Sequence, residues 1–438
     1  MSKKNYIALL DSGVNDWNKW RKSNPNINPN LRGINLGSCT LIGIDFRGAD
    51  LTGANLIKSN FGSSNFDGAN LTGANLTGAN LSGVSLTGAN LTGADLTKAN
   101  YRGAELANSN LRLANLAYAD LRAINFTAAE LNNANLSHAN LNGAIFVGAK
   151  LNRANFELAS LLKTDFTNAN LTNARLNKAD LTQANLDKAD LTNANLFEAN
   201  LQQASLVQTN LTEANLTGAN LTNANLLKSD LSLAFLTNAN LTQTDLIQTN
   251  LSKADLTDAN LTRANLSDAN LVDTQAAIAK FNYSILTGAC VENLQINHQT
   301  SFEKVTCQYL YLKYYQKQRV PKDSKKSLTS DEFKLILQKL LGSVNLVFDT
   351  DINWSAFLNS FEDLQLQYKS QVIKIQSIEV LPHERFLVRI NAVRDLEVDT
   401  IRKHFWQKYQ RSLSTLSQAK LITKESAKNK QANLYEKN

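Results

Sequence analysis

The sequence predicts a mainly β solenoid, a rod that repeats one short unit, and three observations lead to this fold class. Every fifth residue from Leu31 to Leu271 is large and apolar: of these 49 positions, 41 hold Leu, seven hold Phe and one holds Tyr. A small residue, usually Ala, lies two positions before each of them, and Asn or Asp commonly lies one before. Fifteen of the 19 glycines lie two positions after one of these large apolar residues or its in-phase successors. Such a fixed short period indicates one structural unit stacked many times.

The five-residue period requires a corner in every unit, because it matches neither an α-helix at 3.6 residues nor a strand at 2. Gly33 and Gly43 mark the corner early in the chain, and Asn168 and Asn173 take the same place later. Both residue types tolerate the positive φ of the third residue in a type II turn. We therefore expect a short extended piece and a turn in each unit, with Leu and Ala inside and the Asn/Asp, the Thr or Ser and the corner residue outside.

These A-(D/N)-L-x-x units resemble the pentapeptide-repeat proteins. The resemblance implies a right-handed quadrilateral β-helix with four units in each coil. The 54 in-phase positions up to Ile296 would then form about 13 coils, or about 65 Å of rod at roughly 4.8 Å per coil. Residues 20 apart should stack, which predicts an interior aromatic ladder from five of the repeat phenylalanines: Phe46, Phe66, Phe126, Phe146 and Phe166.

Residues 1–30 are predicted to be an N-terminal α-helical cap on a rod that spans residues 31–300. Ile7, Leu10, Val14 and Trp17 have helical spacing within residues 5–22, and the helix should end before Pro25. A β-helix end exposes unpaired backbone groups, so a cap is needed. This segment also resembles the N-terminal cap of cyanobacterial pentapeptide-repeat proteins.

The repeat is expected to end after Thr300, where three further parts follow in the sequence. Residues 301–329 should form an end-covering strand and a linker, and residues 330–438 a small C-terminal α+β domain with a helical tail. Its expected elements are a helix at 330–341, a strand at 344–349, a helix at 353–367, strands at 372–381 and 385–393, and a last helix from about Leu396 into a Lys-rich tail. The segment resembles a C-terminal domain that often follows such repeats in cyanobacteria.

The sequence contains no recognisable catalytic motif. It lacks a phosphate-binding glycine loop, a nucleophile elbow and a His-Glu-x-x-His motif, and its four histidines are dispersed. We therefore predict no catalytic, cofactor-binding or metal site, no small-molecule substrate, and a protein that is not an enzyme. Three cysteines, an odd number, point to the cytoplasm, and the absence of a run of about 18 apolar residues argues against a membrane span.

Apolar residues at positions expected to face solvent are the candidate partner-binding residues. Val207, Leu227 and Ile247 each follow a repeat Leu and lie 20 apart, so they should form a ridge on three successive coils. Val147 belongs to the same column, and Phe197 and Phe235 belong to the opposite face. Contiguous exposed apolar patches tend to mark interaction sites.

The function predicted from these features is a non-enzymatic scaffold or regulator that binds a protein partner. The resemblance implies a developmental regulator as that partner, since some similar proteins act in heterocyst differentiation. One alternative, also from relatives, is a duplex-DNA mimic that binds a topoisomerase, although residues 31–300 carry a net charge of only −4. Another is nucleic-acid binding through the chain after residue 300, with 23 Lys+Arg against 15 Asp+Glu. The same basic region is compatible with homodimerisation.

Overall fold

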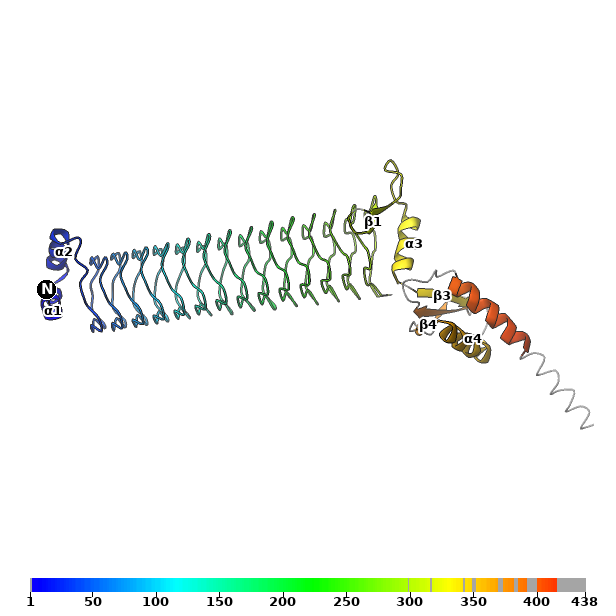
Figure 1. Cartoon of the computed structure of the whole chain (residues 1–438), viewed down its shortest axis with the longest axis horizontal. Coiled ribbons are helices and arrows are strands. Elements are labelled where there is room, and N and C mark those ends of the chain that lie inside the picture. Colours follow the sequence, from blue (N-terminus) through cyan, green and yellow to red (C-terminus); the bar gives the residue numbers. More distant parts are fainter. Residues whose placement is uncertain are drawn as a thin grey trace, which may run out of the picture. The chain divides into compact units, whose positions relative to one another are not determined.

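The structure is a computed structural model that describes residues 2–297, 299–315, 317–341, 343–348, 352–368, 373–381, 385–391 and 400–415. The chain divides into two compact units, Met1–Leu328 and Thr329–Asn438. In the first unit, short coils stack one on another between two N-terminal helices and a β-hairpin (Figure 1).

Parallel backbone bridges join residues that are 20 apart along the rod. The series begins with Asn30 and Asp50 and continues unbroken to Gln275 and Gln295. Each bridge is isolated because every side of a coil is too short to form a longer strand. The spacing confirms four pentads in each coil and hence a four-sided β-helix.

All five backbone N–H groups of a typical pentad are hydrogen bonded, as residues 71–75 illustrate. Leu71 and Gly73 donate to carbonyls of the next coil, and Asn75 donates to the previous coil, at 2.7 to 2.9 Å. Ala74 donates to the Leu71 carbonyl across the corner at 3.0 Å. The remaining N–H, of Thr72, donates to Oδ1 of Asn70 at 3.1 Å. The Asn/Asp position therefore has a structural role that the sequence interpretation missed, since it satisfies the one N–H that no carbonyl reaches.

The corner residues have positive φ whether or not they are glycine. Gly73 lies at φ 62°, and Leu113, Leu233 and Ile278 lie at 58°, 61° and 64°. The expectation of a turn with positive φ at this position is confirmed, but it does not depend on Gly or Asn. A left-handed conformation costs a non-glycine residue roughly 1–2 kcal/mol. The intercoil hydrogen bonds on both sides of each corner offset that cost.

The interior of the rod contains the repeat Leu, Phe and Ala side chains, which are almost completely buried. Phe146 stacks between two other members of the predicted ladder: its ring centroid lies 4.9 Å from that of Phe126 and 5.0 Å from that of Phe166. Phe46 and Phe66 form a separate pair at 5.3 Å. The predicted inward orientation and the aromatic ladder are confirmed.

The coils continue past Thr300, which corrects the expected end of the repeat. One extra residue enters the chain, so the bridge spacing becomes 21, as in Lys280 with Ser301 and Ile285 with Thr306. Phe302 consequently stacks on Phe281, with centroids 4.9 Å apart. The chain then forms an antiparallel hairpin of β1 (Leu310–Lys313) and β2 (Lys317–Val320). A bridge from Cys290 to Tyr311 attaches this hairpin to the coils.

The N-terminal cap consists of two helices rather than the one expected. They are α1 (Lys3–Asp11) and α2 (Val14–Ser23). Gly13, at φ 105°, separates them, a conformation that a helix cannot contain. The break lets both Tyr6 of α1 and Trp17 of α2 become buried, while Ile7 remains exposed.

The described residues of the second unit form a three-stranded antiparallel sheet and three helical segments. In chain order the elements are α3 (Ser330–Leu341), β3 (Ser343–Phe348), α4 (Trp354–Gln367), β4 (Lys374–Leu381), β5 (Arg385–Asn391) and a helical segment at 400–415. The strand order is β3-β5-β4. Side chains of α4, the sheet and residues 400–415 share one apolar core. The expected start of the last helix near Leu396 and the Lys-rich tail lie outside the described residues.

Replacement of Tyr101 by Phe is predicted to raise the thermal unfolding midpoint. The Tyr101 side chain is fully buried, its hydroxyl has no hydrogen-bond partner in the described structure, and burial raises its pKa. Removing an unsatisfied buried hydroxyl removes a desolvation cost of about 1–3 kcal/mol. Tyr118→Phe, at an exposed corner, is the matched control and should leave the midpoint unchanged. A lower midpoint for Tyr101→Phe would contradict the prediction.

Candidate partner-binding surfaces

The polar side chains on the sides of the rod are largely hydrogen bonded to one another. Asn70 Oδ1 accepts from Thr72 Oγ1 at 2.6 Å, and Asn70 Nδ2 donates to Thr52 Oγ1 of the preceding coil at 3.0 Å. The same pattern recurs at Asn210, Thr212 and Thr192. These side chains are already satisfied, so apolar residues among them are the distinctive surface features.

Titratable groups do not assemble into a reactive site in the part of the chain that the structure describes. No group of three or more His, Cys, Asp or Glu side chains there could hold a metal ion. Burial raises the pKa of the Cys290 thiol and raises that of Cys307 to about 12. Both thiols therefore stay protonated near neutral pH and are poor nucleophiles.

Within the described segments, no helix has the length and apolar character that a membrane crossing needs.

The ridge of Val207, Leu227 and Ile247 lies on three neighbouring coils. Gln208 N donates to the Leu227 carbonyl and Lys228 N donates to the Ile247 carbonyl, each at 2.9 Å, which places the three residues directly in line. Their side chains are half-buried. The three form one continuous apolar strip, which we call the ridge.

Val147 and the two candidate phenylalanines are separate from the ridge. Val147 lies three coils before Val207, and polar Thr167 and Asp187 occupy the column between them. Phe197 and Phe235 lie two pentads away from the ridge column, on the opposite side of the rod, and Asn215 bridges to Phe235 from the coil between them. Phe235 is 51% exposed and Phe197 is half-buried.

The most exposed apolar side chains of the repeat lie at corners, which the sequence interpretation did not select. Leu113 is 64% exposed and Tyr118 is 55% exposed. The Tyr118 ring stacks on His138 of the next coil with centroids 4.6 Å apart, and Leu158 follows on the same edge. Their phase, two residues after a repeat Leu, was the signal that could have identified them.

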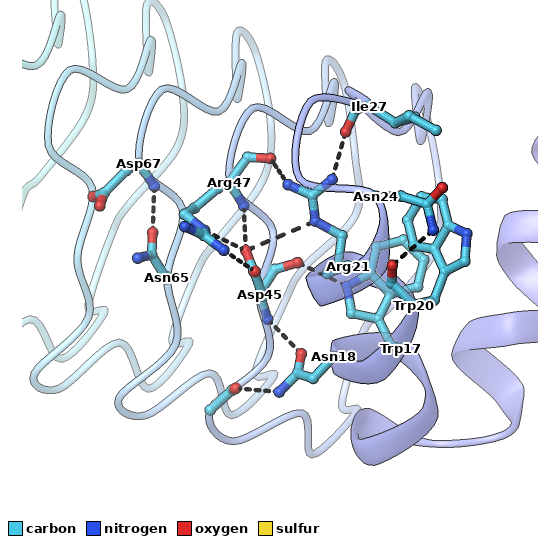
Figure 2. Close-up of polar contacts among 11 residues, drawn as sticks. Trp17, Asn18, Trp20, Arg21, Asn24, Ile27, Asp45, Arg47, Asn65 and Asp67 are labelled. Carbon is cyan, nitrogen blue, oxygen red and sulfur yellow. Dashed lines mark hydrogen bonds and ion pairs between the residues drawn. The ribbon is translucent and has the colours of Figure 1, made fainter.

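The N-terminal cap is attached to the first coils by a cluster of contacts centred on Asp45 (Figure 2). Trp17 Nε1 donates to the Asp45 carbonyl at 2.7 Å, and its ring contacts Phe46 edge-on at 5.4 Å. Asn18 accepts from Asp45 N and donates to the Gly43 carbonyl, both at 2.9 Å. The cap thus covers the interior ladder and bonds to the exposed coil edge.

Arg21 is a buried cation that the sequence interpretation missed. Its guanidinium donates to the carbonyls of Ile27 and of Arg47, the latter at 2.6 Å, and its Nε lies 3.8 Å from Asp45 Oδ1. Arg47 binds the Asp45 carboxylate through two hydrogen bonds of 2.9 and 2.6 Å. The position of Arg21, four residues after Trp17, put it on the buried side of the helix.

The Asp45 carboxylate is held ionised by these two arginines. Burial opposes its ionisation, but hydrogen bonds from Arg47 and the charges of Arg47 and Arg21 outweigh burial and hold the pKa of Asp45 below its usual value. Burial lowers the pKa of Arg21, and Asp45 opposes that shift. We call Arg21, Asp45 and Arg47 the latch.

A four-sided β-helix with a capped end defines the class of this protein as a β-solenoid repeat protein. Eight copies of the family pattern described as Pentapeptide repeats match between residues 30 and 293, over 30–66, 64–100, 89–127, 119–161, 164–203, 194–232, 234–273 and 259–293. The chain therefore belongs to the pentapeptide-repeat family. A comparison with curated proteins found no match.

Three solved structures illustrate the range of similar proteins. HetL from the cyanobacterium Nostoc sp. strain PCC 7120, a protein involved in heterocyst differentiation regulation, is 31% identical; the match covers 60% of this chain and 96% of HetL, with a TM-score of 0.22. Rfr23 from the cyanobacterium Cyanothece 51142 is 42% identical over 21% of this chain and 59% of Rfr23, with a TM-score of 0.18. QnrB1, a plasmid-mediated fluoroquinolone resistance protein, is 15% identical; the match covers 50% of this chain and 91% of QnrB1, with a TM-score of 0.34. At these TM-scores, the superpositions carry no functional argument.

Replacement of Asp45 by Asn is predicted to loosen the cap. The neutral amide leaves Arg21 buried without its counter-charge, and an unpaired buried charge is costly. Hydrogen exchange of α2, measured by mass spectrometry, should become faster. Asp258→Asn, at an exposed corner, is the control and should leave α2 unchanged. Equal protection of α2 in Asp45→Asn and the wild-type protein would show that the latch does not hold the cap.

Acid should loosen the cap in the wild-type protein as well. A carboxyl whose folded pKa is depressed stabilises the fold above its unfolded pKa, about 3.9 for Asp, and that stabilisation is lost as pH falls through the folded value. Exchange of α2, corrected for the intrinsic rate, should therefore rise below about pH 4. The Asp45→Asn variant should not show this rise in α2 exchange at low pH. If the variant still shows the rise, a group other than Asp45 causes it.

Proposed function

We propose that this protein is a non-enzymatic scaffold that holds a protein partner against one side of its rod. The observation that carries the proposal is the ridge of Val207, Leu227 and Ile247 on three neighbouring coils. Apolar side chains on a side that is otherwise filled by hydrogen-bonded polar groups offer a partner an area to bury.

The rigidity of the rod favours such binding. Four of the five backbone N–H groups in a pentad such as 71–75 bond to backbone carbonyls and the fifth bonds to an Asn side chain, so little conformational entropy is lost when a partner docks. Completing the burial of a Val, Leu or Ile side chain contributes up to about 1.5–3 kcal/mol, less here because each is already half-buried. Three such residues can form the centre of a standard interface of about 800 Å² per partner, with Val147, Phe197 and Phe235 as further candidates on the rod.

The partner we propose is a developmental regulator, with heterocyst differentiation as the context that the family resemblance suggests. HetL is described with a role in the regulation of that process. We place the role in the cytoplasm, in keeping with three free cysteines, Cys39, Cys290 and Cys307. Homodimerisation through the second unit is a further proposal, to be tested by sedimentation of the full chain.

The charge arrangement favours the scaffold over the duplex-DNA mimic. A mimic needs dense negative charge, because a duplex carries one charge per roughly 1.7 Å. Several carboxylates of the rod pair with cations, which lowers the negative charge further: Asp120 with Arg122 at 2.6 Å, and Glu130 with Lys150 at 2.7 Å. Glu157 pairs likewise with an arginine. Nucleic-acid binding through the second unit remains the other alternative, and salt-dependent retention of the full chain on DNA would detect it.

Replacement of Leu227 by Asp is predicted to weaken partner capture while the rod stays folded. The new carboxylate interrupts the ridge at its centre and must be desolvated when a partner docks. Affinity capture from the native cell, followed by mass spectrometry, should show at least about a tenfold loss of the specific partner. Thr222→Asp, at the equivalent position of the preceding pentad on an adjacent side, should have no effect. Unchanged capture by Leu227→Asp would remove the ridge as the binding surface.

A truncation separates the two units in the same assay. If the rod selects the partner, residues 1–328 should capture it as the full chain does, since these residues form a compact unit. Loss of the partner with the ridge intact would assign selection to the second unit.

A further inference from the structure

A pocket of about 420 Å³ lies where the β1–β2 hairpin meets the final coils. Its lining includes Asp268, Asn270, Gly288 and three tyrosines, Tyr311, Tyr314 and Tyr315. The volume is within the usual range of small-molecule and side-chain sites, about 300–1,000 Å³. Neither the ridge nor the latch contributes a residue to it.

The pocket contains a carboxylate for which the chain leaves space. A Cβ atom built on Gly288 would lie 2.0 Å from Asp268 Oδ1, so the carboxylate occupies the place of that missing side chain. Gly288 has φ +79°. All corner positions between Gly218 and Gly288 hold larger residues, so the return to glycine at this corner coincides with the place of the Asp268 carboxylate. Asp268 accepts no hydrogen bond from any of the described residues. Burial and the Asp268 charge together raise the pKa of the nearby Tyr309 hydroxyl, and no ion pair with any of the described residues neutralises that charge.

Tyrosine rings at this end of the rod already bind cations. The Arg319 guanidinium lies 4.3 Å from the centroid of Tyr309, and the Lys304 ammonium lies 5.4 Å from that of Tyr283. Among the described residues, no cation covers Tyr311, Tyr314 or Tyr315. Glu292 positions this tyrosine group, because its carboxylate accepts from Tyr314 N at 2.8 Å.

We propose that this pocket binds an alkylated ammonium group, held by Asp268 and by the rings of Tyr311, Tyr314 and Tyr315. Aromatic cages recognise quaternary ammonium ions through the negative face of the ring, and a nearby carboxylate adds charge complementarity. The remaining wall favours an ion without N–H donors. Ala269 and Gly288 offer no polar side chain, and the Cys290 thiol stays protonated. The Asn270 amide is already hydrogen bonded, since it donates to Asn250 Oδ1 and accepts from Val272 N. The group has two sources, a free quaternary ammonium compound or a methylated lysine side chain of a protein.

The first test uses the wild-type full chain with choline and its neutral isostere, 3,3-dimethylbutan-1-ol. Calorimetry or ligand-observed NMR should show saturable binding of choline and at least about tenfold weaker binding of the alcohol, because the two differ in charge but hardly in shape. Equal affinity for choline and the alcohol would show an apolar pocket without cation selectivity, which would overturn the proposal. The proposal would also be overturned if the protein bound neither choline nor a peptide that carries trimethyllysine.

A trimethyllysine peptide distinguishes the two sources. Tighter binding of this peptide than of choline, with no binding of the unmodified or the neutral-isostere peptide, supports a protein-borne ligand. Tighter binding of choline supports a free compound.

Variants then assign the binding to the pocket. Asp268→Asn and Tyr314→Leu should each weaken binding of the preferred probe at least about fivefold. The matched controls are Asp258→Asn and Tyr118→Leu, exposed corner residues distant from the hairpin in sequence, and both should bind as the wild-type protein does. Unchanged affinity in Asp268→Asn and Tyr314→Leu would place the cation elsewhere and overturn the assignment.

Discussion

The hydrogen bonding of the pentad backbone is the constraint on which the rest of this structure depends. Three N–H groups of each regular unit bond to neighbouring coils, one closes the corner, and the last is accepted by the Asn or Asp side chain, as in residues 71–75. Every unit must therefore keep its length and its corner conformation. This requirement explains why Leu113 and Ile278 adopt positive φ despite the cost, and why the repeat keeps its phase from Leu31 to Ile296.

The same bonding makes the two ends of the rod the places where special structure is needed. At the start, α2 supplies donors, an acceptor and the Trp17 ring to an otherwise open coil, and the buried Arg21 joins it to the rest of the latch. At the other end, β1 pairs with the last coil through Tyr311. The pentads between are closely packed and polar on their sides, so the concave site proposed here lies where the terminal hairpin meets the last coils.

Much of the rod could be predicted from sequence because its contacts are local and periodic. The inward Leu and Ala, the stacking of Phe146 with its neighbours 20 residues away, and the alignment of the ridge all follow from one period and one coil length. The coil length itself came from the family resemblance. The partner-binding role of the ridge stays a prediction, since periodicity places side chains and says nothing of what they contact.

Departures from the period could not be predicted in this way. Three such departures depend on contacts with a neighbouring coil or with the rod end. They are the extra residue before Ser301, which changes the bridge spacing to 21, the helix break at Gly13 and the burial of Arg21. The sequence alone determined the repeating unit, its inward and outward residues and its corners, because each unit meets only its copies. Tertiary structure decided how the ends are closed and which tyrosines gather around Asp268, because these contacts join segments that share no repeat and no fixed spacing.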